Sequence, residues 1–182
     1  MRVRRTQLNY LGHVINSIVR MTDPAKVKAV TELAAPKCVM ELETFLGKVG
    51  YYQTFIKDYS DLTKPLNALR GKFTEWIWSP VCQRAFEQLK NLLANSPVLR
   101  HPEFDLPFIL QTDASGYGLG AVLSQEFEDG EHPIAYASRL LLPRETRHAT
   151  IEKEALGVCW AVQHFRHYVI GRPFLFRLTT NL

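Results

Sequence analysis

The stretch Phe108–Gln125, FILQTDASGYGLGAVLSQ, decides the fold predicted for the second half of the chain. An apolar, β-prone run opens it and ends at a single acidic residue, Asp113. Small residues then form a turn and a second β-prone run follows, which is the pattern of a β-hairpin. Asp113 is therefore expected at the end of a buried strand, where a carboxylate is costly unless it is paired. Two interpretations are open: Asp113 caps its own turn, or it binds a cation.

The residues after this hairpin predict two more strands and one long helix. Asp129-Gly130 is typical of a hairpin turn and leads into a strand over 133–138. An amphipathic helix is expected over 150–169, followed by a terminating glycine and a fourth strand from Phe174. The apolar face predicted for this helix consists of Ile151, Ala155, Val158, Val162, Phe165 and Val169.

The residues before the hairpin predict a short strand pair and then a mostly helical unit. The strand pair spans 8–18 and pivots on Gly12-His13. Helix starts are indicated where a polar cap precedes proline, at Asp23-Pro24 and at Ser79-Pro80. Another helix is expected over 40–56, and its Gly47 and Gly50 indicate close packing against a neighbour.

These elements predict an α+β protein with three parts. They are a hairpin over 1–21, a helical unit over 22–95, and a mixed sheet with one long helix over 96–182. Three cysteines without close spacing indicate neither a disulfide framework nor a zinc site. No secretory signal is recognisable, and the longest apolar run, 155–162, is too short to span a bilayer. We therefore expect an intracellular protein with no membrane contact.

Charge is distributed unevenly along the chain. The first 95 residues carry 14 basic and 8 acidic side chains, whereas the other 87 carry 8 and 10. This division suits a first half that binds phosphates and a second half that binds cations. Ordinary solvated surfaces explain the same numbers, so charge alone leaves both interpretations open.

Two glutamates lie in the first turn of the long predicted helix, where the helix dipole favours negative charge. Because Glu152 and Glu154 are two residues apart, they point to different sides. We interpret Glu152 as a capping or solvated charge, and we expect Glu154 to face the sheet. An inward-facing Glu154 beside Asp113 would make a cation site, and a solvated helix acid is the alternative.

A second candidate site combines aromatic and basic residues in the predicted helix over 40–56. Tyr51, Tyr52 and Phe55 with Lys48 and Lys57 suit a nucleic-acid surface, because bases stack on aromatic rings and phosphates attract lysines. The alternative is that aromatic residues at helical spacing are core residues and the lysines are merely solvated.

Several segments, in order, resemble gypsy-type LTR-retroelement reverse transcriptases. The thumb region of that family is similar to YLGHVI (10–15), DPAKVKAV (23–30) and FLGKVGYYQTFIKDYSDLTKPLNAL (45–69). The ribonuclease H domain that follows it is similar to SPVLRHPEFDLPFILQTDASGYGLGAVLSQ (96–125) and EKEALGVCWAVQHFRHYVIG (152–171). The resemblance covers nearly the whole chain.

The resemblance implies a thumb or connection region followed by an RNase H-like domain, whose family cleaves RNA in RNA–DNA hybrids with two Mg²⁺ (or Mn²⁺) ions. Asp113 matches the first catalytic aspartate and Glu154 the helix glutamate, so both are expected as catalytic residues and metal ligands. The implied partners are RNA–DNA hybrid or duplex nucleic acid, and the remainder of the polyprotein. The residues expected to contact nucleic acid are Gly12, His13, Tyr51, Tyr52, Lys57 and Ser115.

Two departures from the family pattern limit the expected activity. None of the six aspartates is adjacent to another, so the Asp-Asp pair of a polymerase is missing. Thr180 stands where the family has its third nuclease carboxylate, and the end at Leu182 indicates a C-terminally incomplete domain. Two carboxylates would bind magnesium weakly. We therefore expect no polymerase activity and little or no nuclease activity, with a non-catalytic nucleic-acid-binding module or a vestigial remnant as alternatives.

Overall fold

A small antiparallel sheet begins the fold in the computed structural model, which describes residues 7–178. Its strands, in spatial order, are β1 (Gln7–Tyr10), β2 (His13–Asn16), β3 (Val19–Thr22) and β4 (Leu99–Arg100). The predicted strand pair is confirmed as β1 and β2. The two-residue β4 was not predicted, because its short run follows the helices and finds its partner, β3, about 80 residues earlier in the chain.

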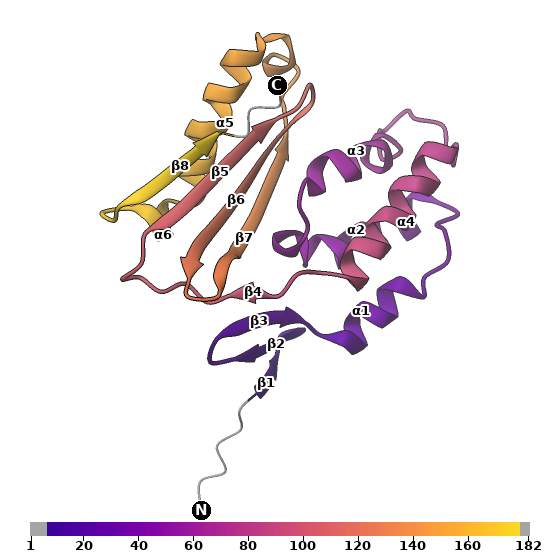
Figure 1. The fold of residues 1–182 in the computed structure, drawn as a ribbon. Coiled ribbons are helices and arrows are strands. Elements are labelled where there is room, and N and C mark those ends of the chain that lie inside the picture. The colour runs from indigo at the N-terminus through magenta and orange to yellow at the C-terminus, as the bar shows by residue number, and fades with distance from the viewer. Residues whose placement is uncertain (1–6, 179–182) are drawn as a thin grey trace, which may run out of the picture.

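Four helices follow the first three strands (Figure 1). They are α1 (Pro24–Thr31), α2 (Val39–Gly50), α3 (Tyr59–Ala68) and α4 (Pro80–Ala94). Both predicted helix starts are confirmed, since the Asp23 side chain accepts a hydrogen bond from the Ala25 N–H and Ser79 accepts one from Cys82. The helix predicted over 40–56 ends at Gly50, and a 3₁₀ turn, η1 (Gln53–Phe55), follows it.

The core of the helical unit is apolar and fully enclosed. Leu42, Phe45 and Val49 of α2 contribute to it with exposed fractions of 1% or less, and Phe86 and Leu89 come from α4. Burying one such side chain contributes about 1.5–3 kcal/mol. The packing of these helices therefore follows from the apolar spacing on which their prediction depended.

The larger sheet contains the strand pair quoted at the outset. Its strands are β5 (Phe108–Ala114), β6 (Gly118–Phe127), β7 (Gly130–Leu140) and β8 (Phe174–Leu178). The spatial order is β7-β6-β5-β8, with β5, β6 and β7 antiparallel and β8 parallel to β5. A 3₁₀ turn, η2 (Glu145–Arg147), and the helices α5 (Thr150–His164) and α6 (Arg166–Val169) connect β7 to β8. The predicted α+β fold with a mixed sheet is confirmed, and the structure adds that the fourth strand, β8, is parallel to β5.

The long predicted helix is present but differs in two respects. It is interrupted at Phe165, and its buried side includes Gly157 and Ala161, whereas Ile151 is 78% exposed and Ala155 is exposed. The prediction for the first turn of the apolar face was therefore wrong. Small residues face the sheet because α5 crosses it closely. A Cβ added at Gly157 would lie 3.7 Å from the Leu119 side chain, which leaves no space for a large residue.

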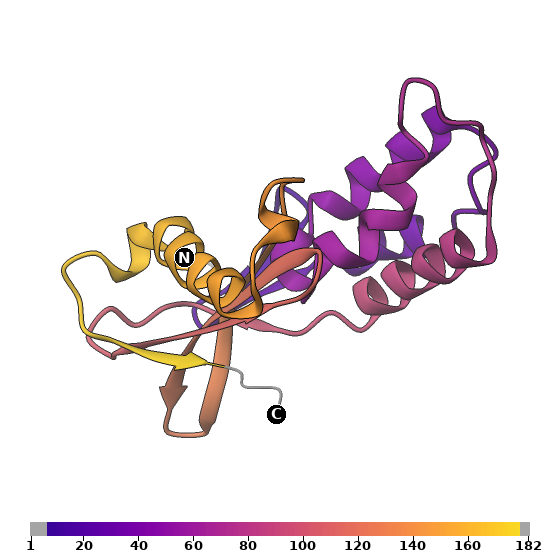
Figure 2. The same ribbon diagram turned by 90° about the horizontal axis from the view of Figure 1, so that it is seen from above.

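The helical unit lies against the larger sheet beside β7, while α5 covers the opposite face (Figures 1 and 2). Tyr136 of β7 packs against the helical core, and its neighbours Ala135 and Ala137 belong to the core under α5. A hydrogen bond joins the two parts, from the backbone N–H of Ser60 to the Ser138 hydroxyl at 2.9 Å. Within residues 7–178, no helix has the length and apolar character needed to cross a membrane.

Candidate nucleic-acid interface and carboxylate site

The tip of the β1–β2 hairpin is a two-residue turn held by tyrosines. Leu11 and Gly12 both have positive φ angles, 46° and 75°, and the flanking Tyr10 and His13 are paired across the ladder. The Tyr52 hydroxyl donates to the Gly12 carbonyl at 2.8 Å, and the Tyr51 hydroxyl donates to the Leu11 carbonyl. The structure thus brings together Gly12, His13, Tyr51 and Tyr52, four of the residues predicted to contact nucleic acid. The first two lie about 40 positions before the other two in the sequence.

An aromatic stack lies directly behind this tip. The His13 ring is parallel-stacked, at 21° in both cases, with Tyr51 at 5.2 Å and Phe55 at 5.6 Å. Burial, and then the nearby Arg20 charge, lower the pKa of His13, opposed by a backbone hydrogen bond at Met21. The neutral form of His13 is therefore favoured. Of the two interpretations of these aromatic residues, the core interpretation fits Tyr52 and Phe55, which are 4% and 1% exposed, but not Tyr51, which is 51% exposed.

A largely apolar groove of about 690 Å³ runs between the hairpin tip, α1 and α2. Lys26 of α1 and Lys48 of α2 contribute exposed ammonium groups to its walls. The apolar floor and the two cations suit a ligand with sugar rings and phosphates. The groove residues are Leu11, Gly12, Lys26, Ala29, Val30, Lys48, Tyr51 and Tyr52.

Asp113 and Glu154 form the second site, where β5 approaches the first turns of α5. Burial raises the pKa of Glu154, and the Asp113 charge raises it further, while a backbone hydrogen bond at Ala114 opposes both effects. The Asp113 charge thus acts on Glu154, and the assignment of the two residues as metal ligands stays a prediction. Glu152 caps the helix instead, because it accepts the Ala149 N–H at 2.8 Å.

The helical unit contributes two further carboxylates that sequence reasoning missed. Asp58 lines the same shallow depression as Asp113 and Lys57, and its Oδ1 lies 2.8 Å from the position that a Cβ on Gly120 would occupy. Burial raises the pKa of Asp58, and the charges of Asp113 and Asp61 raise it further against the opposing effect of Lys57. No sequence signal marks Asp58, because a long-range contact brings it to the sheet.

Ser115, rather than Asp113, caps the turn between β5 and β6. Its hydroxyl accepts the Tyr117 and Gly118 N–H groups and donates to Asp61 Oδ2 at 2.8 Å. The turn is further tied to the helical unit by Lys64, whose Nζ lies 3.0 Å from the centre of the Tyr117 ring. Lys57, predicted to contact nucleic acid, lines the depression beside Asp113 and is not one of the groove residues.

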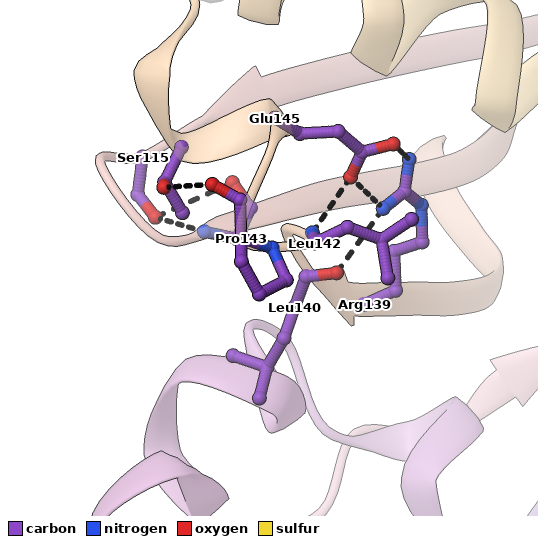
Figure 3. Close-up of polar contacts among 8 residues, drawn as sticks. Ser115, Arg139, Leu140, Leu142, Pro143 and Glu145 are labelled. Atoms are coloured by element: carbon purple, nitrogen blue, oxygen red, sulfur yellow. Dashed lines mark hydrogen bonds and ion pairs between the residues drawn. The ribbon is translucent and has the colours of Figure 1, made fainter.

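The loop before α5 is fixed by an ion pair (Figure 3). Arg139 binds both carboxylate oxygens of Glu145, at 2.7 and 3.2 Å, and Glu145 also accepts the Leu142 N–H at 2.8 Å. These bonds lower the pKa of Glu145 to about 2, and those from the Arg139 side chain have the largest effect. The pair therefore stays charged at neutral pH and anchors the loop that leads to Glu154.

The carboxylates of Asp113 and Glu154 are chemically suitable ligands for a hard cation, but they are few. Carboxylate oxygens are ligands that Mg²⁺ and Mn²⁺ accept, and a cation would relieve the repulsion between Asp113 and Glu154. Within the described residues, however, no group of three or more His, Cys, Asp or Glu side chains could hold a metal ion. Thr180, which the resemblance places at the position of the family's third carboxylate, lies outside the described residues.

The larger sheet and its helices match a known protein family. A family described as "RNase H-like domain found in reverse transcriptase" matches residues 78–176, more than half of the chain. The chain belongs to this family. RNase H-like domains typically use divalent metals, and the binding of such an ion by Asp113 and Glu154 stays a prediction.

Similar proteins among curated sequences are retrotransposon polyproteins, which this RNase H-like chain matches along almost all of its length. It is 40% identical to the Pol polyprotein of transposon 297 of Drosophila melanogaster over 178 residues, and 35% identical to that of transposon gypsy. It is 34% identical to the Tf2-3 polyprotein of Schizosaccharomyces pombe. These matches cover 92–97% of the chain but only 13–17% of the relatives, so the chain spans about an eighth to a sixth of their length.

Solved structures support the same fold. The foamy viral protease-reverse transcriptase dRH in complex with double-stranded DNA matches with a TM-score of 0.83 and 21% identity, covering 97% of this chain and 31% of that one. The foamy viral enzyme in complex with an RNA/DNA hybrid matches with a TM-score of 0.80 and the same identity, covering 24% of that chain. The predicted relationship to retroelement reverse transcriptases is confirmed, and this RNase H-like chain is similar to one part of retroelement Pol polyproteins.

Proposed function

We propose that this RNase H-like chain binds duplex nucleic acid, either DNA or an RNA–DNA hybrid, in the groove between the hairpin tip and α2. The observation that carries the proposal is the groove itself, with an apolar floor between two lysines and an exposed tyrosine at its edge. The solved foamy viral structures of the same fold hold double-stranded DNA and RNA/DNA hybrid. Gly12 and His13 act here as parts of the hairpin that borders the duplex.

A glycine on α2 supports this location. Gly47 precedes Tyr51 by one helical turn, so both lie on one side of α2, and a Cβ at Gly47 would meet no atom within 4 Å. The expectation that both α2 glycines pack against a neighbour is met only by Gly50, whose added Cβ would lie 3.2 Å from the Tyr59 hydroxyl. A solvent-facing glycine costs a helix about 1 kcal/mol relative to alanine, and close approach of a ligand backbone accounts for it.

Binding to a 20-bp hybrid and to a DNA duplex, titrated over a range of salt concentrations, tests the proposal. We expect affinity to fall steeply with salt, with the slope of log K against log salt reduced by about one unit in Lys48→Ala, because each phosphate contact releases counterions. Absence of binding at low salt would exclude the proposal and favour the alternative that the chain is a vestigial remnant.

Two glycine substitutions provide a matched pair. Gly47→Ala and Gly157→Ala each remove a helix glycine without a close contact, the nearest atom to the added Cβ being 3.7 Å away at Gly157. Both are expected to stabilise the fold by about 0.5–1 kcal/mol. Only Gly47→Ala is expected to weaken duplex binding, since Gly157 faces Leu119 under α5. Equal binding by both variants would place the duplex elsewhere.

A second, weaker activity is favoured by the interaction of Asp113 with Glu154. We propose that these two residues hold a divalent ion, which in this family supplies an activated water and a stabilised leaving oxygen for RNA cleavage. With Thr180 in the place of the third carboxylate, binding is weak and cleavage is low or absent, and no polymerase activity is assigned. Incubation of a labelled hybrid with Mg²⁺ or Mn²⁺ decides this: robust cleavage that is lost in Asp113→Asn would refute the assignment of a defective centre.

A further inference from the structure

We propose that Tyr51 and Tyr52 are positioning residues whose hydroxyl groups hold the hairpin tip against the end of α2 and so set the width of the groove. The inference rests on the proposed function, because it assigns these two tyrosines a role at the same duplex-binding groove. It differs from stacking of both aromatic rings on nucleic-acid bases, which the aromatic and basic composition of this segment alone would indicate.

The hairpin tip needs an external hold because its backbone is strained. Leu11 has a φ angle of 46°, in the left-handed region that disfavours any residue with a Cβ. Such a conformation persists where the surroundings impose it. The two turn residues also lie outside the β1–β2 ladder, which ends at the Tyr10–His13 pair, so their carbonyl groups can accept hydrogen bonds from other parts of the protein.

The two tyrosine hydroxyls donate those hydrogen bonds. Tyr51 donates to the Leu11 carbonyl, and Tyr52 donates to the Gly12 carbonyl, which also accepts the Asp23 N–H at 3.1 Å. The Gly12 position has no spare room, since an added Cβ would lie 2.9 Å from the Tyr52 hydroxyl. Successive residues at the end of α2 thus hold successive residues of the tip.

The two rings make different contacts, so the hydroxyls and the rings have separate roles. Tyr52 lines the groove but is only 4% exposed and its hydroxyl is used by the hairpin, so its main effect on a ligand is through the position of the tip. Tyr51 is 51% exposed and stacks on His13, which leaves one part of its ring at the groove. Replacing either tyrosine by phenylalanine removes the hold on the tip and keeps the ring.

Amide hydrogen exchange of the free 182-residue chain tests the positioning role without any ligand. We expect exchange at residues 10–13 to become about fivefold faster in Tyr52→Phe and in Tyr51→Phe, as for the loss of one hydrogen bond, while the helical core exchanges unchanged. Tyr59→Phe is the matched control, because its hydroxyl makes only a long bond of 3.5 Å, to the Leu46 carbonyl, away from the tip. Unchanged exchange at the tip in both variants would overturn the proposal, and should Tyr52→Phe fail to fold, Tyr51→Phe decides it.

Duplex binding by the same variants tests the functional consequence. We expect Tyr52→Phe to bind about fivefold more weakly with an unchanged salt slope, because no phosphate contact is lost. Faster exchange at the tip with unaltered affinity and salt slope would overturn the assignment to the groove. If the unmodified chain does not bind a duplex, the proposed function fails, and the exchange result still decides whether the tyrosines hold the hairpin.

Discussion

Gly118 is a residue whose importance comes from the other half of the molecule. It begins β6 beside the Ser115 turn, and a Cβ built on it would overlap the Asp61 carboxylate, with Cγ 3.0 Å away. Asp61 has little freedom to move, because the Ser115 hydroxyl donates to it at 2.8 Å. Gly118 therefore serves the docking of α3 as well as the turn itself.

Substitution of Gly118 by alanine is therefore expected to destabilise the protein by about 1–3 kcal/mol, the usual range for overpacking a tight contact. The free energy of unfolding in urea measures it. Gly116→Ala is the control, expected within about 0.5 kcal/mol of the unmodified chain, since its added Cβ would meet no atom within 4 Å. Asp61→Ala in the Gly118→Ala background should recover part of the loss; no recovery would mean that Asp61 is not the cause.

Glu145 gives the protein a specific dependence on acid. Its pKa is lowered from 4.5 to about 2 in the folded chain, first by the Arg139 hydrogen bonds and then by the Leu142 N–H. A carboxyl with a depressed folded pKa binds protons more readily in the unfolded state. Its contribution to stability is thus fully present above pH 4.5 and is lost as the pH falls towards about 2.

Glu145→Gln should flatten the curve of unfolding free energy against pH between these two values and lower stability at neutral pH. Arg139→Gln should flatten the same part of the curve, because it removes the main cause of the lowered pKa of Glu145. Urea unfolding at a series of pH values measures both. A curve in either variant as steep as that of the unmodified chain would show that the ion pair does not control acid stability.

At the scale of elements, the features that could be predicted from the sequence are those that depend on residues close to one another in the chain. Asp23 and Ser79 cap their helices as read from the sequence, because a capping side chain acts on the backbone next to it. The buried side of α5 was partly mispredicted, since Ile151 offers more apolar surface than Gly157 yet is exposed. The close approach of α5 to Leu119 decides that choice, and no local signal contains it.

The same distinction between local and long-range signals applies to the residues of the candidate site. Asp113 and Glu154 were singled out because a strand end and a helix start each place a carboxylate recognisably in the sequence. Asp58 was missed, because its φ of 54° and its position beside Gly120 depend on how α3 docks on the sheet. The link from Tyr52 to Gly12 joins residues 40 positions apart, so the sequence named both without indicating that they touch.

At the scale of the whole molecule, the helical unit and the larger sheet share an interface beside the carboxylate site. Ser60 binds Ser138, Asp61 binds Ser115, and Tyr136 of the sheet packs into the helical core. The small sheet adds a further link, because β3 precedes the helices and β4 follows them. Any motion that separates the two parts would therefore break these contacts.

We expect the two parts to unfold together, and the tryptophans allow each part to be observed alone. Trp76 and Trp78 pack against the helical core, and Trp160 packs against the core under α5. Fluorescence of Trp160→Phe reports the helical unit, and that of Trp76→Phe/Trp78→Phe reports the sheet, each referenced to its own far-ultraviolet circular dichroism. Coincident thermal transitions in each variant are the expected outcome for one cooperative unit. A fluorescence transition that precedes the circular dichroism transition would mean that the interface at Ser138 and Ser115 is too weak to couple them.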